Sequence, residues 1–155
     1  MTHLPHFLAG LILVGTVAAL SIPDSSTIAG PATTIDGDTI QINKTRIRLW
    51  GIDAPERSQP QGPAATNHLR GLTSDIVTCT RQDTDRYGRI VARCATMGQP
   101  DIGRAMVVAG HALDYTRYSR GYYADAEREA RAARRGIHAG AFVNPEMHRA
   151  GKQTR

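Results

Sequence analysis

The sequence is poor in aromatic residues and in cysteine, and both shortages limit its chemistry. Aromatic side chains make up 5% of the 155 residues, so any stacking of nucleic-acid bases must rest on a few tyrosines. The two cysteines, Cys79 and Cys94, form no CxxC motif and show no zinc-ligand spacing with histidine, which disfavours a zinc site. The chain also has no internal repeat and no low-complexity tract, and its length suits one domain.

Long apolar runs are lacking as well. The longest one, Phe7–Leu20, is uncharged but shorter than a typical transmembrane helix. The small residues Ala18 and Ala19 are typical of a signal-peptide cleavage region. We therefore predict a signal peptide over residues 1–23 and an exported protein, periplasmic or secreted. Lysine and arginine are missing before the run, so an uncleaved anchor that attaches the protein to a membrane is the alternative.

Acidic residues are outnumbered by basic ones. The chain has 14 Asp and Glu against 19 Lys and Arg, which gives a formal net charge of +5. This balance favours an acidic partner such as nucleic acid or an anionic membrane. Arg131, Arg134 and Arg135 come late in a helical segment, where they suit the helix dipole, so we do not interpret them as a binding patch.

Short strands and helices alternate along the rest of the chain. Period-two alternation or apolar content predicts strands at Thr39–Asn43, Thr45–Ile52, Ile76–Thr80, Ile90–Cys94 and His111–Tyr115. Helical spacing predicts three helices, which begin at Pro63, at Asp101 and near Tyr123. The expected organisation is a linker over 24–32, an α+β domain with a small antiparallel barrel over 33–143, and a polar tail over 144–155.

Two acidic turns flank the first predicted hairpin. They have the sequences Asp36-Gly37-Asp38 and Asp53-Ala54-Pro55-Glu56. Carboxylates from neighbouring turns can converge as ligands for Ca²⁺, which accepts irregular oxygen-rich sites. Each sequence taken singly is also an ordinary turn former. The candidate cation site therefore depends on both turns lying together.

Two arginines supply a second component. Arg48 lies on the polar face of the second strand, and Arg89 ends the turn of 83–89. Either one alone could be a surface ion-pair partner, but a guanidinium binds two phosphate oxygens at once. Phosphodiester cleavage needs a cation and arginines to offset charge on the phosphate oxygens, and a carboxylate to accept a proton from water.

The two cysteines fall opposite each other if 79–94 is a hairpin that turns at Arg86-Tyr87. Cross-strand neighbours lie within the Cα separation that a disulfide tolerates. Two buried free thiols are the alternative. A disulfide would agree with export, because disulfides persist in oxidising compartments.

Three motifs in this order, IDGDT, RIRLWGIDAPE and DRYGR, closely resemble the staphylococcal nuclease (thermonuclease) family. The similarity runs from about Thr34 to Gly140. The resemblance implies a five-stranded OB-fold-type barrel with three α-helices. It also implies an endonuclease that cleaves DNA and RNA with Ca²⁺ and leaves 5′-hydroxyl and 3′-phosphate ends. We expect a monomer.

The resemblance also implies roles for individual residues. Asp38 and Asp53 match the Ca²⁺ ligands, together with the main-chain carbonyl of Ala54, where the family has threonine. The implied catalytic residues are Arg48, Glu56 as general base, and Arg89. The implied substrate contacts are Arg86, Tyr87, Tyr115 and Tyr118.

A noncatalytic OB-fold module that binds nucleic acid is the alternative function. Such modules often have their catalytic positions replaced. Here every catalytic and metal position is filled, which argues against that alternative. The loop from Arg57 to Gly62 is shorter than in the family and lacks its lysine-rich segment, which bears on substrate affinity.

Overall fold

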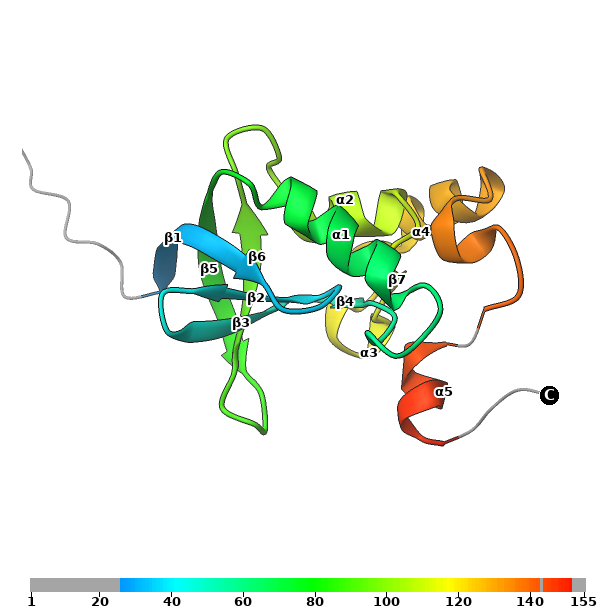
Figure 1. Ribbon diagram of the computed structural model, residues 1–155, viewed down its shortest axis with the longest axis horizontal. Coiled ribbons are helices and arrows are strands. Elements are labelled where there is room, and N and C mark those ends of the chain that lie inside the picture. Colours follow the sequence, from blue (N-terminus) through cyan, green and yellow to red (C-terminus); the bar gives the residue numbers. More distant parts are fainter. Residues whose placement is uncertain (1–25, 143, 152–155) are drawn as a thin grey trace, which may run out of the picture.

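A closed five-stranded barrel packs beside a group of helices in the computed structural model, which describes residues 26–142 and 144–151 (Figure 1). In pairing order the strands are β1 (Thr27–Thr34), β2 (Thr39–Ile42), β3 (Thr45–Leu49), β6 (Ile90–Ala95) and β5 (Ile76–Thr84). β5 closes the barrel against β1. The predicted α+β class and five-stranded barrel are confirmed, although β3 and β6 pair in parallel rather than antiparallel. The predicted signal peptide over 1–23 lies outside the described residues.

The helices lie at one end of the barrel. They are α1 (Gly62–Leu72), α2 (Ile102–Val108), α3 (Thr116–Ser119), α4 (Ala124–Ala132) and α5 (Pro145–Arg149), with a 3₁₀ turn at Gly136–His138. A small sheet of β4 (Ile52–Asp53) and β7 (Leu113–Asp114) lies between barrel and helices. The three predicted helices correspond to α1, α2 and α4. No described helix has the length and apolar content needed to cross a membrane.

Two additional helices correct the sequence-based prediction. The short α3 occupies most of 116–121, where the sequence patterns predicted neither a strand nor a helix. The terminal α5 forms inside the predicted polar tail over 144–155. Asn144 caps this helix, because its side chain accepts a hydrogen bond from the Glu146 amide at 2.8 Å, and Pro145 follows at the first helical position.

The prediction of a linker over 24–32 is wrong, because β1 begins at Thr27. Gly30 and Pro31 suggested a linker, but both suit a strand that changes partner. Residues 27–31 pair with β5 and residues 32–34 pair with β2. Gly30 makes this bend with φ of 157°, and a Cβ there would lie 3.0 Å from the Ile42 side chain.

The barrel interior and the helix contacts form one hydrophobic core. Alternate residues of β2, β3, β5 and β6 point inward and are almost fully buried: Ile40, Ile42, Ile47, Leu49, Val77 and Ala92. The helices add Ala65, Leu69, Ile102, Met106, Val107 and Ala126 to the same cluster. Because Ile47 and Leu49 face the core, Arg48 between them lies on the outer face of β3.

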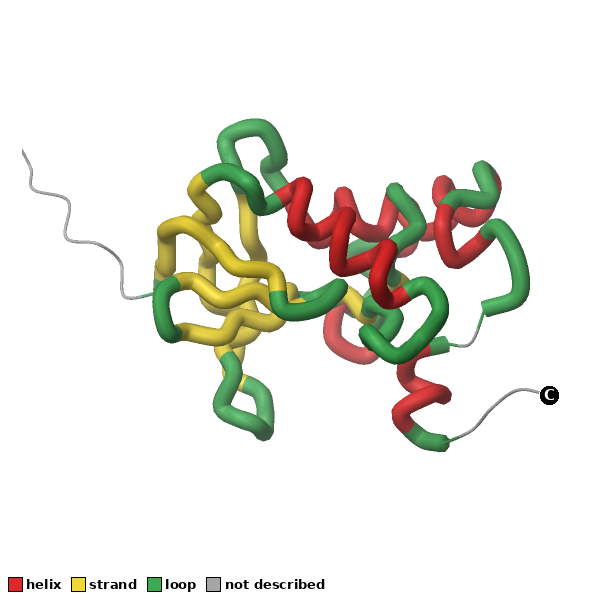
Figure 2. The backbone as a smooth tube through the Cα atoms, in the orientation of Figure 1, coloured by secondary structure: helices red, strands yellow, loops and turns green. Residues whose placement is uncertain are grey.

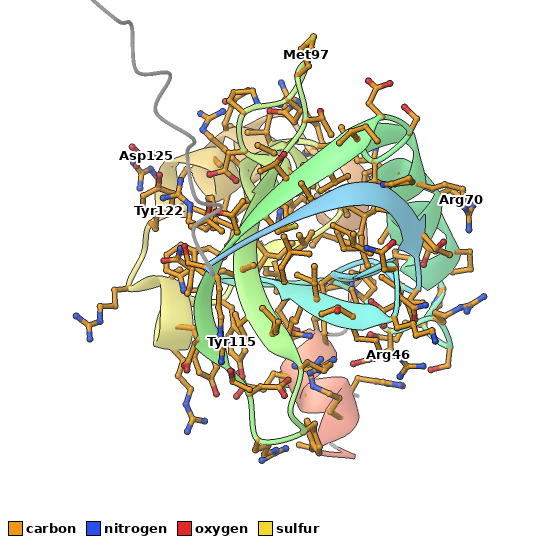
Figure 3. All side chains as sticks on the ribbon, turned by 90° about the vertical axis from the view of Figure 1, so that its left-hand side faces the viewer. Arg46, Arg70, Met97, Tyr115, Tyr122 and Asp125 are labelled. Carbon is orange, nitrogen blue, oxygen red and sulfur yellow. A yellow bond between two sulfur atoms is a disulfide. The ribbon has the colours of Figure 1, made fainter. Side chains whose placement is uncertain are left out.

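Asp101 connects the barrel to two helices. Its side chain caps α2 by accepting a hydrogen bond from the Arg104 amide at 2.9 Å. The same carboxylate pairs with Arg93 of β6 at 3.0 Å and accepts a hydrogen bond from the hydroxyl of buried Tyr123 at 3.1 Å. Arg93 also lies over the ring of Tyr122, which Figure 3 shows near Asp125 at the edge of the molecule. These contacts fix α2 and α4 relative to β6.

Gly37 lets the first acidic turn approach both the second one and α1. A Cβ at this position would lie 2.7 Å from the Ala54 Cβ and 2.9 Å from the Ala65 Cβ. Real Cβ atoms do not approach so closely, so any larger residue would push the turns apart. The close packing of Asp36-Gly37-Asp38 against Ala54 therefore requires glycine.

A disulfide joins Cys79 of β5 to Cys94 of β6, with a Cα–Cα distance of 4.0 Å. The two residues are directly opposed in the antiparallel pair, and both are buried. Beyond them the hairpin continues to a turn that projects past the barrel (Figure 2). The disulfide therefore closes the base of the hairpin that ends in Arg86, Tyr87 and Arg89.

We predict that Cys79→Ala/Cys94→Ala lowers the free energy of unfolding by about 3 kcal/mol, as expected for a crosslink that closes a loop of about 15 residues. Urea unfolding monitored by circular dichroism measures the change. Reductant should destabilise the wild type by a similar amount and leave the double variant unchanged. Equal stability of wild type and variant without reductant would contradict the prediction.

We also predict that Gly37→Ala lowers the free energy of unfolding by about 1–3 kcal/mol, because it overpacks the contact with Ala54 and Ala65. Gly71→Ala is the matched control. Gly71 lies in α1, and a Cβ added there would have no atom within 4 Å, so alanine should stabilise the protein by about 0.5–1 kcal/mol. Chemical denaturation of both variants tests the pair; a stabilised Gly37→Ala would refute the packing argument.

Candidate active site

Asp38 and Asp53 come together at the junction of barrel and helices. Asp38 immediately precedes β2 and Asp53 ends β4, and the two residues are 5% and 2% exposed. The Leu49 amide donates to the Asp38 carbonyl at 2.8 Å, which holds the first acidic turn against the end of β3. The Ala54 amide donates to Asp38 Oδ2 at 3.4 Å. Both predicted metal aspartates, and Ala54, therefore lie in one buried cluster.

Arg48 bridges the two aspartates. Its Nη1 lies 2.8 Å from Asp38 Oδ2 and its Nη2 lies 3.2 Å from Asp53 Oδ1. The same Nη2 donates to the Ile52 carbonyl at 3.3 Å. A single guanidinium can reach both carboxylates only if they lie a few ångströms apart. The arginine predicted to bind phosphate thus also offsets the repulsion between the two aspartates.

Glu56 lies on the turn after β4, three residues from Asp53. The turn is closed by Gln59: the Glu56 amide donates to Gln59 Oε1 at 2.7 Å, and the Gln59 amide donates to the Glu56 carbonyl at 2.8 Å. The Glu56 side chain is 39% exposed, in contrast to the buried aspartates. A carboxylate that combines solvent access with a fixed backbone is suited to accept a proton from water.

Arg89 directly precedes β6, the strand that pairs with β3. In the parallel β3–β6 pair, Ile47 is opposite Ile90 and Arg48 is opposite Val91. Residues 89, 91 and 93 alternate with buried Ala92 and Cys94, so Arg89 lies on the outer side with Arg48. The structure therefore brings the two predicted arginines to one face.

Asp85 holds Arg89 in position. Arg89 Nε lies 2.7 Å from Asp85 Oδ2, and the Arg89 and Tyr87 amides both donate to Asp85 Oδ1 at 2.9 Å. Burial alone would raise the pKa of Asp85, but the hydrogen bonds from Arg89 and Tyr87 outweigh it and lower that pKa. Since the ion pair uses Nε, the terminal nitrogens of Arg89 have no hydrogen-bond partner within the described chain.

The predicted substrate contacts divide into two groups. At the hairpin tip, the Arg86 guanidinium lies 4.8 Å from the ring centre of Tyr87, which is 69% exposed. Tyr115 and Tyr118 form an edge-to-face pair with ring centres 4.9 Å apart, beside α3. Burial, followed by the negative charges of Glu146 and Asp53, raises the pKa of Tyr115. This places Tyr115 within electrostatic reach of the carboxylate cluster, while Arg86 and Tyr87 extend from the barrel.

The sequence-based reasoning missed two residues of this region. Asp36 accepts a hydrogen bond from the Asp38 amide at 3.1 Å, and burial together with the Asp38 charge raises the pKa of Asp36 to about 6. Because Asp36 lies in the first acidic turn, the sequence could have identified it as a site residue. Arg149 of α5 contacts both Asp53 and Glu56, and its position in the polar tail gave no signal at all.

The donor set suits a hard cation with an incomplete protein shell. Asp38 and Asp53 could supply carboxylate oxygens, and the Ala54 amide lies beside Asp38. Among the residues that the structure describes, no group of three His, Cys, Asp or Glu side chains forms a metal site. Two buried carboxylates close enough for one guanidinium still fit Ca²⁺, which completes its shell with carbonyls and water.

Comparisons with known proteins identify a family and several named relatives. The family described as staphylococcal nuclease homologue matches residues 46–139. The micrococcal nuclease of Shigella flexneri is 33% identical over 143 residues, which cover 81% of this chain and 82% of that protein. An uncharacterized endonuclease of Escherichia coli is 36% identical over 109 residues, or 66% of this chain and 71% of its own.

A third relative has a different kind of name. The succinoglycan biosynthesis protein ExoI of Rhizobium meliloti (strain 1021) is 30% identical over 140 residues, covering 83% of this chain and 73% of its own. The family match spans the second acidic turn and both arginines, and two of the three relatives are named as nucleases. On this evidence the chain belongs to the staphylococcal nuclease homologue family.

Proposed function

We propose that this protein is an exported, Ca²⁺-dependent nuclease that hydrolyses phosphodiester bonds of DNA and RNA without discriminating the sugar. The observation that carries the proposal is the bridge from Arg48 to Asp38 and Asp53, with Glu56 on the adjoining turn. It unites the predicted cation ligands with a phosphate-binding group and a solvent-accessible carboxylate. Membership of a family with nuclease-named members supports a nucleic-acid substrate.

In the proposed mechanism, each residue has one task. Asp38, Asp53 and the Ala54 carbonyl would hold Ca²⁺. Bound there, the cation would offset negative charge on a nonbridging phosphate oxygen. Glu56 accepts a proton from the water that attacks phosphorus in line with the departing 5′-oxygen. Arg48 and Arg89 donate hydrogen bonds to the phosphate oxygens, where charge increases in the transition state. The departing 5′-oxygen takes up a proton from solvent, so the products are 5′-hydroxyl and 3′-phosphate ends.

The exposed aromatic residues suit contacts with the nucleotides around the cleaved bond. Tyr118 is 54% exposed and adjoins Tyr115, which supports a role of this pair in base stacking. Arg86 and Tyr87 are accessible at the hairpin tip for phosphate or base contacts. We propose that the substrate crosses from the tyrosine pair, over the carboxylate cluster, towards the hairpin.

Export is supported by the buried cross-strand disulfide, because such bonds persist in oxidising compartments. We propose a cleaved signal peptide, with retention at a membrane through the same segment as the alternative. A monomer is proposed for the active form.

Glu56→Gln should lower the initial rate of single-stranded DNA cleavage by at least about 100-fold at saturating Ca²⁺, because it removes the proton acceptor. A chelator should abolish wild-type cleavage. Glu56 is a better target than Arg48, since removing Arg48 leaves the buried Asp38 carboxylate without its cationic partner at a cost of about 3–5 kcal/mol in stability.

The matched control for this prediction is Glu129→Gln, the same charge change at an exposed ion pair with Arg135. It should cleave at the wild-type rate. Undiminished cleavage by Glu56→Gln would remove that residue from the mechanism. Tight DNA binding by the wild type without cleavage, in any divalent metal, would favour the noncatalytic OB-fold module instead.

A further inference from the structure

The terminal helix α5 places an arginine on the candidate active site. Arg149 Nη2 lies 2.8 Å from Asp53 Oδ2 and 3.0 Å from Asp53 Oδ1. Its Nη1 lies 2.8 Å from Glu56 Oε1. These contacts span 96 and 93 residues of sequence. In Figure 1, α5 lies below the loop between β4 and α1. One guanidinium thus joins a candidate cation ligand to the candidate general base.

Asp53 has no carboxylate oxygen left without a cationic partner. Arg149 takes both oxygens, and Arg48 Nη2 adds a second contact to Oδ1 at 3.2 Å. Ca²⁺ binds carboxylate oxygens at about 2.3–2.6 Å, so a cation on Asp53 would lie next to the positive guanidinium. The two cannot share these oxygens without strong repulsion. Binding of a cation to Asp53 therefore requires Arg149 to move.

The helix that bears Arg149 is built to allow such movement. It has five residues, too few to be stable in isolation, so its position depends on its contacts with the rest of the protein. Pro145 is buried at its start, while the Arg149 side chain at its end is 37% exposed. Release of this short helix would free Asp53 and Glu56 without disturbing the barrel.

We propose that Arg149 is a further residue of the site, which holds Asp53 and Glu56 in the cation-free protein, leaves them when Ca²⁺ binds, and so sets the calcium affinity. The inference rests on the proposed function, because it takes Asp53 as a Ca²⁺ ligand. Suppose that, without Ca²⁺, the conformation with Arg149 on Asp53 and Glu56 is about ten times more populated than the released one. The apparent dissociation constant for Ca²⁺ is then raised about tenfold.

Arg149→Gln tests the proposal by isothermal titration of Ca²⁺ into the full chain. The variant should bind about tenfold more tightly than the wild type. Arg149→Lys keeps the charge but cannot contact two carboxylates at once as the guanidinium does. Its Ca²⁺ affinity should therefore lie between those of the wild type and Arg149→Gln. Arg128→Gln is the matched control: it removes one arginine from an exposed ion pair with Asp125 on α4 and should leave the dissociation constant unchanged.

Hydrogen exchange of α5 supplies a readout that is independent of affinity and of cleavage. Saturating Ca²⁺ should speed exchange of the α5 amides in the wild type and have no such effect in Arg149→Gln, whose helix is already released. A weaker or unchanged Ca²⁺ affinity in Arg149→Gln would overturn the proposal and leave the nuclease assignment intact. If neither protein binds Ca²⁺, the proposed calcium site fails as well, and with it this inference.

Discussion

The arrangement of this site depends on keeping two buried carboxylates side by side. Asp38 and Asp53 repel each other, and burial weakens the screening that water would provide. Arg48 compensates from the adjacent strand by contacting both. Three other features are tied to this need for compensation. They are the hairpin register that places Arg48, the glycine that lets the turns approach, and the contact of Asp53 with a second cation, Arg149.

The barrel provides the geometry that this compensation requires. Thr39 and Arg48 are paired across the β2–β3 hairpin, so Asp38 at the start of β2 lies next to Arg48. The parallel pairing of β3 and β6 then brings Arg89 to the same outer face. A purely antiparallel sheet would place the β5–β6 turn differently relative to β3. The one parallel pair in the barrel is therefore central to the site, although it looks like an irregularity of the sheet.

Local sequence predicted most of the barrel and the core of the site, because the informative residues lie within single hairpins or turns. It failed where long-range contacts decide the structure. Gly30 and Pro31 look like a linker, and only pairing with two different strands makes them part of β1. Arg149 lies in a polar tail, and its partners are more than ninety residues away. No local sequence pattern predicts the contacts of Arg149, because they depend on where the folded domain positions its C-terminal segment.

The disulfide has a consequence for proteolysis as well as for stability. The hairpin tip between Cys79 and Cys94 is an exposed turn, the kind of segment at which proteases cut first. A single nick there would fall inside the loop that the disulfide closes. Both halves of the chain would remain covalently joined, and Arg89 would stay attached to β6, where the barrel holds it. The protein can thus lose the continuity of its backbone at this turn and still remain one molecule.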